Sequence, residues 1–300
     1  MSKVSKLIRY VSNNDYRFMV NAAHGAYKSM KDEEYLKRMF QAKLGYELNL
    51  NNPQTFNEKL QWLKLHNRKS IYTMMVDKYE AKEFIANRVG KEYIIPTLGV
   101  WNKFEEIDFN SLPNQFILKC THDSGGLVIC KDKSKLAQQS VRKKINNCLQ
   151  KNYYYKYREW PYKNVKPRII AETLLQNKTG EEIKDYKFHC FDGKVKILYV
   201  TSDRFSGKEL KADYFDDQFE KLDIQWELPN SNYKIEKPQN FELMKSIAQK
   251  LSSDIPTLRV DFYEVNGKVY VGELTFFDGS GFAEISGNWD KILGSYIELY

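Results

Sequence analysis

Three charged residues near the C-terminus, Arg259, Asp261 and Glu273, are of types that bind metal ions and phosphoryl groups. They flank Asn266-Gly267, a dipeptide that strongly favours a β-hairpin turn. Because side chains alternate along a strand, Arg259 and Asp261 share one face of the sheet. Mg²⁺ takes hard oxygen ligands, usually one or two carboxylates with phosphate oxygens, and an arginine stabilises a phosphoryl group in transfer. The same spacing is equally compatible with an ordinary surface ion-pair cluster.

Whether the two carboxylates meet depends on the register of the hairpin. A strict two-residue turn pairs Asp261 with Gly272 and sends Glu273 to the opposite face. A three-residue loop over 266–268, with Gly267 in a bulge, pairs Asp261 with Glu273 instead. Only the second register brings both carboxylates and the guanidinium together, and the sequence does not choose between them.

A second candidate site is a glycine loop at 121–126, directly after the apolar segment 115–120. Consecutive glycines let a backbone approach a phosphate closely, and neighbouring N–H groups can form an anion nest. Lys119, near the end of the preceding strand, would supply a positive charge for phosphate oxygens. The chain has neither the GxxxxGK[ST] nor the GxGxxG pattern. Taken alone, a Gly-Gly hairpin turn is a weak signal.

The elements that must position these residues change in character near residue 90. Before it the pattern is helical, with a capping box at Thr55–Glu58. Helices are expected over 77–89, closed by Gly90, and over 134–150, 238–252 and 288–299. Strands are expected over 92–101, 115–120, 127–130, 168–175, 183–191, 194–201, 257–265 and 268–276. Antiparallel hairpins separated by single helices indicate an α+β fold.

The composition favours a globular protein with anionic partners. Hydrophobic residues make up 42% and aromatic residues 14% of the 300 positions, which excludes a disordered chain. The formal net charge is +8, and lysines and arginines concentrate in 142–144 and 151–168. The second stretch interleaves them with tyrosines and Trp160. It is either a solvated face or a surface that holds a sugar polymer or another acidic acceptor.

Four scattered cysteines without a CxxC pair argue against zinc and against a disulfide framework. No apolar run reaches the roughly 18 residues that a membrane helix needs. The basic N-terminal segment is interrupted at Asn13-Asn14-Asp15, which is unlike a signal peptide. We therefore expect a cytoplasmic protein.

Taken in chain order, several short motifs resemble the successive signatures of ATP-grasp ligases. These are Asp77-Lys78, 116–119 with its glycine loop, 170–175, 185–187, 259–261 and 273–275. The chain also resembles one particular family, the TupA-like ATP-grasp family, over nearly its whole length from about residue 35. The similar segments are 55–65, 77–83, 115–126, 159–175, 186–199 and 258–281. The resemblance implies an ATP-grasp fold, in which two α+β lobes clasp ATP. It places a helical N-terminal segment at 1–95, a smaller lobe with the glycine flap at 96–172, and a C-terminal lobe with the metal site at 173–300.

The same resemblance implies an ATP site shared by both lobes. The phosphates would be held by Lys78 and Lys119, under a flap formed by Ser124, Gly125 and Gly126. The adenine hinge would be formed by Glu172, Thr173, Leu174 and Leu175, and Asp185 would lie near the ribose. Asp261, Glu273 and Thr275 would ligate Mg²⁺, Arg259 would steady an acyl-phosphate, and Lys187 would lie near phosphate or substrate. This assignment favours the bulged register.

Two positions depart from the family pattern. ATP-grasp enzymes commonly carry Asn where this chain has Thr275, although a hydroxyl can still ligate Mg²⁺. Asp123 puts a negative charge into a loop that is usually richer in glycine. Its side chain would either point away, contact metal, or weaken the nucleotide site.

The implied activity is an ADP-forming carboxylate–amine ligase that requires ATP and Mg²⁺. Its substrates would be a uronic-acid or glutamyl carboxylate of a capsular or other surface polysaccharide and an amino acid or small amine. We expect no nucleic acid as a partner. We do expect peripheral contact with membrane-associated polysaccharide machinery. One alternative is a glycosyltransferase that uses the acidic run 213–217, and another is an inactive polysaccharide-binding module.

Overall fold

The structure, a computed structural model, describes residues 3–123, 125–203 and 209–299. Its helices are α1 Lys3–Ser12, α2 Asn14–Ala23, α3 Asp32–Leu44, α4 Phe56–His66, α5 Ile71–Val76, α6 Ala81–Val89, α7 Gln138–Leu149, α8 Tyr154–Tyr157, α9 Phe241–Leu251 and α10 Trp289–Ser295. Short 3₁₀ turns lie at η1 Lys91–Tyr93, η2 Phe104–Glu106, η3 Lys133–Lys135, η4 Trp160–Asn164 and η5 Asp278–Gly281. The strands are β1 Thr97–Trp101, β2 Phe116–Cys120, β3 Val128–Cys130, β4 Ile169–Thr173, β5 Asp185–Phe191, β6 Lys194–Ser202, β7 Lys211–Asp216, β8 Lys221–Leu222, β9 Thr257–Val265 and β10 Lys268–Thr275.

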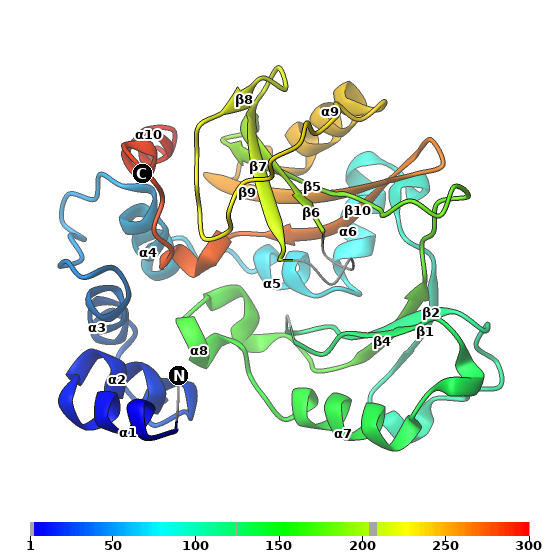
Figure 1. The fold of residues 1–300 in the computed structure, drawn as a ribbon, viewed down its shortest axis with the longest axis horizontal. Coiled ribbons are helices and arrows are strands. Elements are labelled where there is room, and N and C mark those ends of the chain that lie inside the picture. The colour runs from blue at the N-terminus through cyan, green and yellow to red at the C-terminus, as the bar shows by residue number, and fades with distance from the viewer. Residues whose placement is uncertain (1–2, 124, 204–208, 300) are drawn as a thin grey trace.

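The strands form two separate antiparallel sheets, which confirms the expected α+β class. The smaller sheet has the order β1-β4-β2-β3, and the larger has the order β10-β9-β5-β6-β7-β8. Figure 1 shows the small sheet with α7 at the bottom, the large sheet with α9 at the top, and α1, α2 and α3 at the lower left. Each sheet has its own hydrophobic core, and a third core lies among the N-terminal helices.

The capping box at the start of α4 is confirmed. The Thr55 hydroxyl accepts a hydrogen bond from the Glu58 N–H at 3.2 Å, and the Glu58 carboxylate accepts one from the Thr55 N–H at 3.0 Å. The predicted helix over 77–89 is wrong in its first turn, because α6 begins only at Ala81. The Asp77 carboxylate accepts hydrogen bonds from the N–H groups of Tyr79 and Glu80, so this residue ends α5 and caps the next turn.

Two other expected elements are shorter than their sequence patterns. The segment 92–101 is a strand only over β1, because the 3₁₀ turn η1 ends just before Pro96. The predicted helix over 134–150 is divided into η3 and α7. The Asp132 carboxylate accepts from the Ser134 N–H at 3.0 Å, so the first turn closes on itself before α7 begins.

The hairpin of β9 and β10 contains both features that the sequence had offered as alternatives. Its turn is the two-residue type, since Val265 pairs with Lys268, and the backbone is left-handed at Asn266 and Gly267. Asp261 nevertheless pairs with Glu273, because the register shifts between Val271 and Glu273. The extra residue is therefore at position 272, and the three-residue loop with a bulge at Gly267 is wrong. Gly272 fits there because a Cβ would lie 2.7 Å from the ring of Tyr263.

Polar side chains of α4 hold the turn η5 in place. The Gln61 amide donates to the carbonyl of Gly281 at 2.6 Å, and the Lys64 ammonium donates to the carbonyl of Ser280 at 2.7 Å. Lys64 is completely buried, and burial lowers its pKa to about 7, against the opposing effect of the Glu159 carboxylate. Helix α4 thereby fixes the turn that follows β10.

No helix among the described residues is both long enough and apolar enough to cross a membrane.

A glycine in α10 sets how closely this helix approaches α4. A Cβ at Gly294 would lie 2.2 Å from the carbonyl oxygen of Gln54 and 2.8 Å from the N–H nitrogen of Phe56. Both are backbone atoms, so the helices must separate to relieve the clash. We predict that Gly294→Ala lowers the free energy of unfolding by about 1–3 kcal/mol, measured by urea denaturation. The neighbouring exposed Ser295→Ala should change it by less than about 0.5 kcal/mol, and an equal effect of the two substitutions would contradict the packing argument.

Candidate active site

The glycine loop joins the end of β2 to the start of β3 in the small sheet. Of the predicted flap, Gly125 and Gly126 are described, whereas Ser124 lies outside the described residues. The Asp123 carboxylate is buried and accepts a hydrogen bond from the Gly126 N–H at 3.0 Å. Of the three outcomes expected for Asp123, the structure supports a side chain that points away, because the carboxylate is directed back into its own loop. His122 is also buried, and its Nε2 lies 3.1 Å from the carbonyl oxygens of Cys148 and Lys151.

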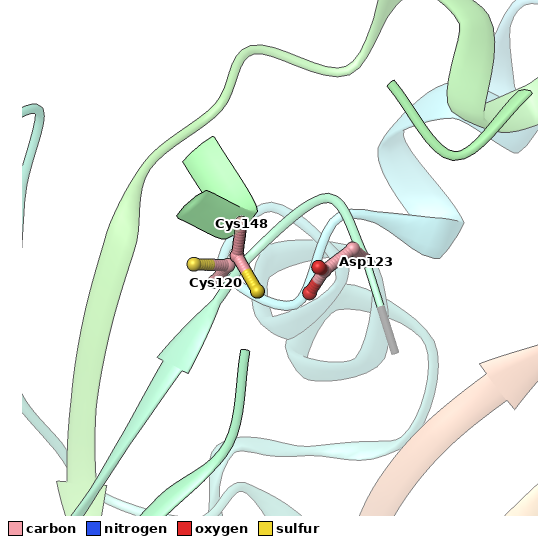
Figure 2. A group of neighbouring side chains, drawn as sticks. All are labelled: Cys120, Asp123 and Cys148. Carbon is pink, nitrogen blue, oxygen red and sulfur yellow. The ribbon is translucent and has the colours of Figure 1, made fainter. Parts of the chain in front are cut away.

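Asp123 lies beside two thiols at the base of the loop (Figure 2). The Sγ atoms of Cys120 and Cys148 and a carboxylate oxygen of Asp123 all lie within 4.8 Å of one another. A closed structural zinc site takes four ligands, whereas this cluster provides three, one of which already accepts from Gly126. Burial and the charge of Asp123 raise the pKa of both thiols, which disfavours the thiolates that bind metals. We interpret the cluster as packing beneath the loop.

Two lysines, one from the small sheet and one from helix α6, converge on the buried carboxylate of Glu172. Lys119 from β2 lies 2.7 Å from it, and Lys82 from α6 lies 2.5 Å from it. Burial would raise the pKa of Glu172, but the two ammonium groups lower it below its ordinary value. Lys82 was not identified from the sequence, although it follows Lys78 by four residues, one turn further along the expected helix.

An apolar pocket of about 170 Å³ adjoins this ion pair. The predicted hinge residues Glu172, Thr173, Leu174 and Leu175 line it, together with Asp185. Apolar walls come from Ile95, Ile117, Leu127, Ile129, Ile183 and Tyr263. Strand β4 ends at Thr173, so the backbone of Leu174 and Leu175 runs outside the sheet ladder. An apolar slot of this kind, lined by backbone outside the sheet, has the chemistry to bind a heterocyclic base.

Lys78 connects the glycine loop to the metal candidates of the large sheet. Its ammonium donates to the carbonyl of Asp123 at 2.7 Å and lies 3.2 Å from the carboxylate of Glu273. Burial would raise the pKa of Glu273, but Lys78, Arg259 and Lys187 lower it to about 2. Its side chain is 34% exposed, so Glu273 is the carboxylate of this group that solvent and ligands reach most easily.

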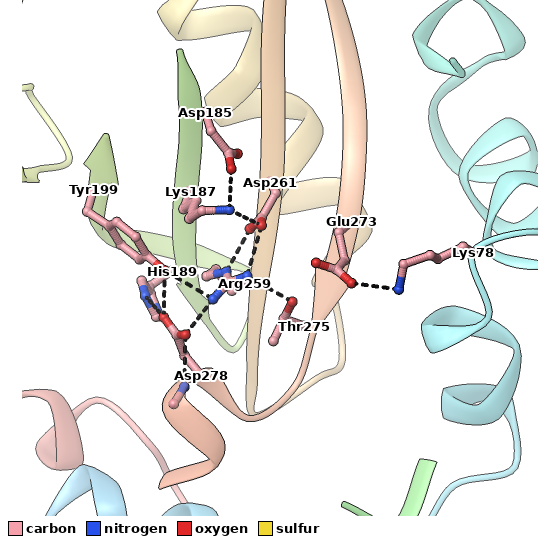
Figure 3. Close-up of polar contacts among 11 residues, drawn as sticks. Lys78, Asp185, Lys187, His189, Tyr199, Arg259, Asp261, Glu273, Thr275 and Asp278 are labelled. Carbon is pink, nitrogen blue, oxygen red and sulfur yellow. Dashed lines mark hydrogen bonds and ion pairs between the residues drawn. The ribbon is translucent and has the colours of Figure 1, made fainter. Parts of the chain in front are cut away.

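Arg259 is the centre of the polar cluster on the large sheet (Figure 3). Its Nε and Nη2 donate to the two oxygens of Asp261, at 2.7 and 2.8 Å. Nη2 also donates to the Thr275 hydroxyl at 3.1 Å, and Nη1 donates to Tyr199 and to Asp278. Since a guanidinium has five N–H groups, every donor of Arg259 is directed at a protein acceptor. Asp261 and Asp278 raise its pKa well above the ordinary value, although burial acts in the opposite direction.

Asp278 in η5 is the second anionic partner of Arg259 and was missed in the sequence. Its carboxylate also accepts from the Tyr199 hydroxyl at 3.1 Å and lies 3.1 Å from His189 Nε2. Burial would raise its pKa, but Arg259 and His189 hold it well below the usual range. Period-two alternation in the expected strand places His189 on the same face as Asp185 and Lys187, so His189 could have been found. Nothing in the sequence pattern points to Asp278.

Lys187 lies between two buried carboxylates. Its ammonium lies 2.7 Å from Asp185 and also donates to Asp261. Burial lowers the pKa of such a lysine, but the two neighbouring charges more than compensate and raise it. Lys187 therefore stays protonated and compensates the negative charge of Asp261.

The donor set fits a magnesium ion and a nucleotide. Asp261, Glu273 and Thr275 supply only oxygen donors, as Mg²⁺ prefers, and they occupy facing positions of β9 and β10. Asp261 already accepts three hydrogen bonds from cations, whereas Glu273 has one ion pair. For a nucleotide, the apolar slot and the lysine pair Lys78 and Lys119 lie at adjoining pockets that share Lys119 and Glu172.

The acidic run at 213–217, on which the glycosyltransferase alternative rests, is engaged in structural contacts. Asp213 is buried beside Lys221, at 2.8 Å, and Asp217 lies 2.9 Å from Lys245. Asp216 accepts hydrogen bonds from two N–H groups of the turn after β7. These carboxylates thus stabilise the β7–β8 turn.

A family model described as TupA-like ATPgrasp matches residues 58–298. No curated protein is significantly similar to the chain in sequence. Among solved structures, the D-alanine–D-alanine ligase from Bacillus anthracis complexed with ATP is 15% identical, with 68% of this chain and 54% of that chain covered and a TM-score of 0.40. The corresponding ligase from Helicobacter pylori is 17% identical, with 81% and 69% covered and a TM-score of 0.40. The ATP-grasp ligase PsnB, complexed with a phosphomimetic variant of its minimal precursor, Mg and ADP, is 13% identical, with 80% and 66% covered and a TM-score of 0.41.

The chain thus spans about half the length of the Bacillus anthracis ligase. Structural similarity at these TM-scores assigns no role to any residue of this chain.

The low pKa of Glu273 predicts how the stability of the fold responds to acid. A carboxylate whose pKa is lowered from 4.5 to about 2 on folding contributes stability above pH 4.5, and this is lost as the pH falls towards 2. We therefore expect the free energy of unfolding to fall less steeply between pH 4.5 and 2 in Glu273→Gln than in the unchanged chain. The exposed Glu236→Gln should follow the unchanged chain. Identical slopes for Glu273→Gln and the unchanged chain, by urea denaturation at each pH, would contradict the role of the three cations.

Proposed function

We propose that this chain, which belongs to the TupA-like ATP-grasp family, is an ATP-dependent carboxylate–amine ligase that forms an amide through an acyl-phosphate. One observation carries the proposal. Lys78 bridges the glycine loop of the small sheet and Glu273 of the large sheet, beside the Arg259–Asp261 pair. Charges suited to the terminal phosphates of a nucleotide therefore lie on both sides of one site.

The proposed reaction has two steps, and neither requires a nucleophile from the enzyme. A carboxylate oxygen of the acceptor attacks the γ-phosphorus of ATP, the bond to the β–γ bridging oxygen breaks, and ADP leaves. The amine then attacks the acyl carbon, phosphate leaves, and the amine loses a proton. An acyl-phosphate is needed because a free carboxylate has no adequate leaving group at neutral pH.

In this proposal each group of the site has one role. Lys78 and Lys119 bind phosphate oxygens, Glu172 to Leu175 flank the base, and Asp185 lies at the ribose end. Glu273, Asp261 and Thr275 would hold Mg²⁺, which supplies neutralisation of the charge that builds up on the phosphates. Ser124, Gly125 and Gly126 would form the flap over the phosphates; of their N–H groups, that of Gly126 would have to leave the Asp123 carboxylate to donate to a phosphate.

Arg259 and Lys187 are proposed to act on the transferring group from the large sheet. Because all donors of Arg259 are occupied, it would reach a phosphoryl oxygen by exchanging a bond to a neutral acceptor, either Thr275 or Tyr199. Its bonds to Asp261 and Asp278 are charge-assisted and hold its position. Lys187 keeps Asp261 charge-balanced throughout.

We further propose that the acceptor carboxylate belongs to a uronic acid or a glutamyl group of a capsular or other surface polysaccharide, and that the amine is an amino acid or another small amine. The net charge of +8 supports an anionic acceptor. A cytoplasmic setting is proposed because all four cysteines are buried and unpaired, as in reducing compartments.

The expected contact is with membrane-associated polysaccharide machinery, and we propose that helix α1 supports it by binding the membrane surface. Val4, Leu7, Ile8 and Val11 follow the spacing of one helical face, and each is 62–66% exposed. The helix contains no acidic residue, and Lys6 and Arg9 are exposed on it. An amphipathic basic helix of this kind binds at the surface of an anionic bilayer.

We predict that Leu7→Gln combined with Ile8→Gln abolishes sedimentation with vesicles that contain anionic phosphatidylglycerol. The matched pair Ile71→Gln and Leu243→Gln also removes two exposed apolar side chains, elsewhere on the surface, and should leave binding unchanged. Equal binding of all three proteins, or concentration-dependent dimerisation lost only in the α1 variant, would contradict membrane contact.

A glycosyltransferase has less support, because the carboxylates of 213–217 stabilise a turn. An inactive binding module would keep the basic surface but split no ATP. A rise in melting temperature with ATP and Mg²⁺, but not with a UDP-sugar, favours the ligase over the glycosyltransferase. Formation of ADP separates the ligase from the inactive module.

The central prediction is that the chain converts ATP to ADP and phosphate, not to AMP and pyrophosphate, only when a carboxylate acceptor is present. Hydroxylamine should intercept the acyl-phosphate as a hydroxamate, detected by mass spectrometry alongside ³¹P NMR. Glu273→Gln, which changes the partly exposed carboxylate of the proposed metal site, should lower the rate on the order of 10²–10³-fold while the protein stays folded. Formation of AMP, or release of UDP from a nucleotide sugar without ATP, would overturn the proposed function.

A further inference from the structure

A cavity of about 450 Å³ lies between the N-terminal helices and the glycine loop. One wall is the end of α2 and the turn after it, up to Lys28. The other is the segment 150–156, which runs from the end of α7 into α8. Its volume is in the range of pockets that bind whole ligands. The α2 wall precedes residue 58, where the family match begins. This half of the cavity is therefore an addition to the matched region.

A buried arginine fixes the two walls relative to each other. The Arg158 guanidinium, 1% exposed, donates to the carbonyls of Tyr27 at 2.6 Å and Met30 at 3.3 Å. It also lies 4.3 Å over the ring of Tyr35, whose hydroxyl donates to the carbonyl of Lys156 at 2.8 Å. These contacts cross between residues more than a hundred positions apart, so the cavity is formed before any ligand binds.

The lining is positive and aromatic. Lys28, Lys151 and Lys156 contribute ammonium groups, and Tyr153 and Tyr155 contribute rings. Lys28 lies 5.5 Å over Tyr155, and Lys156 lies 5.8 Å over Tyr153. The one acidic lining residue, Asp123, is buried and bonded to Gly126. Two of the three ammonium groups thus lie over aromatic faces at the cavity, where a ligand carboxylate can reach them.

This combination matches a saccharide that bears carboxylates. The face of a pyranose ring presents C–H groups, which suit the negative face of an aromatic ring, while its carboxylate pairs with an ammonium group. An extended acidic peptide would instead use a strand edge or backbone partners, and this cavity has a helix end and a short connecting segment as its walls.

The cavity also reaches the phosphate end of the candidate active site. Asp123 and Gly125 of the glycine loop line it. The Asp123 carbonyl accepts from Lys78, which in turn lies beside Glu273. A ligand in the cavity is therefore separated from the phosphate-binding lysine by a single loop.

We propose that this cavity binds the uronic-acid-bearing saccharide that supplies the acceptor carboxylate, and that the N-terminal helices add this specificity to the ligase. The binding itself stands on the cavity, whereas its role as the acceptor site rests on the proposed function.

The test is a calorimetric titration of the full chain with tetragalacturonate in the absence of nucleotide. We expect saturable binding, which the fully methyl-esterified tetrasaccharide does not show. Replacing Lys28, Lys151 and Lys156 together by Gln should weaken it about tenfold or more, as expected when exposed charge pairs are lost. The same replacement of Lys135, Lys143 and Lys234, which lie outside the cavity, changes the net charge equally and should leave affinity unchanged.

Three results would overturn the proposal: no saturable binding, an equal loss in both triple variants, or tighter binding of tetraglutamate that depends on the same three lysines. The last would identify an acidic-peptide site.

A second measurement separates this proposal from the ligase function: the rise in melting temperature that ATP causes in the Lys28, Lys151 and Lys156 variant. If this rise is retained while saccharide binding is lost, the cavity and the nucleotide site are distinct. If tetragalacturonate binds but no ADP ever forms, the ligase fails and the binding site stands.

Discussion

The arrangement of the large sheet depends on a single saturated guanidinium. Arg259 joins β9 to Thr275 at the end of β10, to Tyr199 of β6 and to Asp278 of η5. A buried ion cluster of this kind is stable only when it is complete, because removing one partner leaves an uncompensated charge in a poorly hydrated site. The same requirement explains why Lys187, between Asp185 and Asp261, must remain charged. The geometry of the site thus depends on the mutual compensation of these buried charges as well as on packing.

Electroneutrality alone would not bring Glu273 into this cluster, since the register of the hairpin decides which side chains face it. The extra residue at position 272 lets the hairpin keep a tight Asn266-Gly267 turn and still set Glu273 opposite Asp261. A bulge re-aims side chains without changing the sheet order. The outermost strand pair thereby directs one carboxylate towards Lys78, and so towards the glycine loop of the other sheet.

The sequence allowed much of this to be predicted, and the failures have physical causes. Local signals such as the capping box at Thr55 and the left-handed turn at Asn266-Gly267 depend on neighbouring residues, so they were confirmed. The bulge could not be predicted, because it depends on the fit of Gly272 against Tyr263 across the sheet. Asp278 was missed for the same reason, since its place beside Arg259 depends on tertiary contacts, including the bonds from α4 to η5. The roles of the site residues in ligand binding stay predictions.

In this structure the lysines assigned to phosphates are paired with carboxylates of the same site. Lys119 faces Glu172, and Lys78 faces Glu273, one of the residues assigned to magnesium. Under the proposed function, a phosphate that takes Lys78 away from Glu273 would leave this carboxylate uncompensated unless a cation replaced the ammonium group. Nucleotide and metal therefore have to bind together, because each restores the charge balance that the other disturbs. An ion-paired resting site of this kind favours the magnesium complex of a nucleotide over the free nucleotide or the free ion.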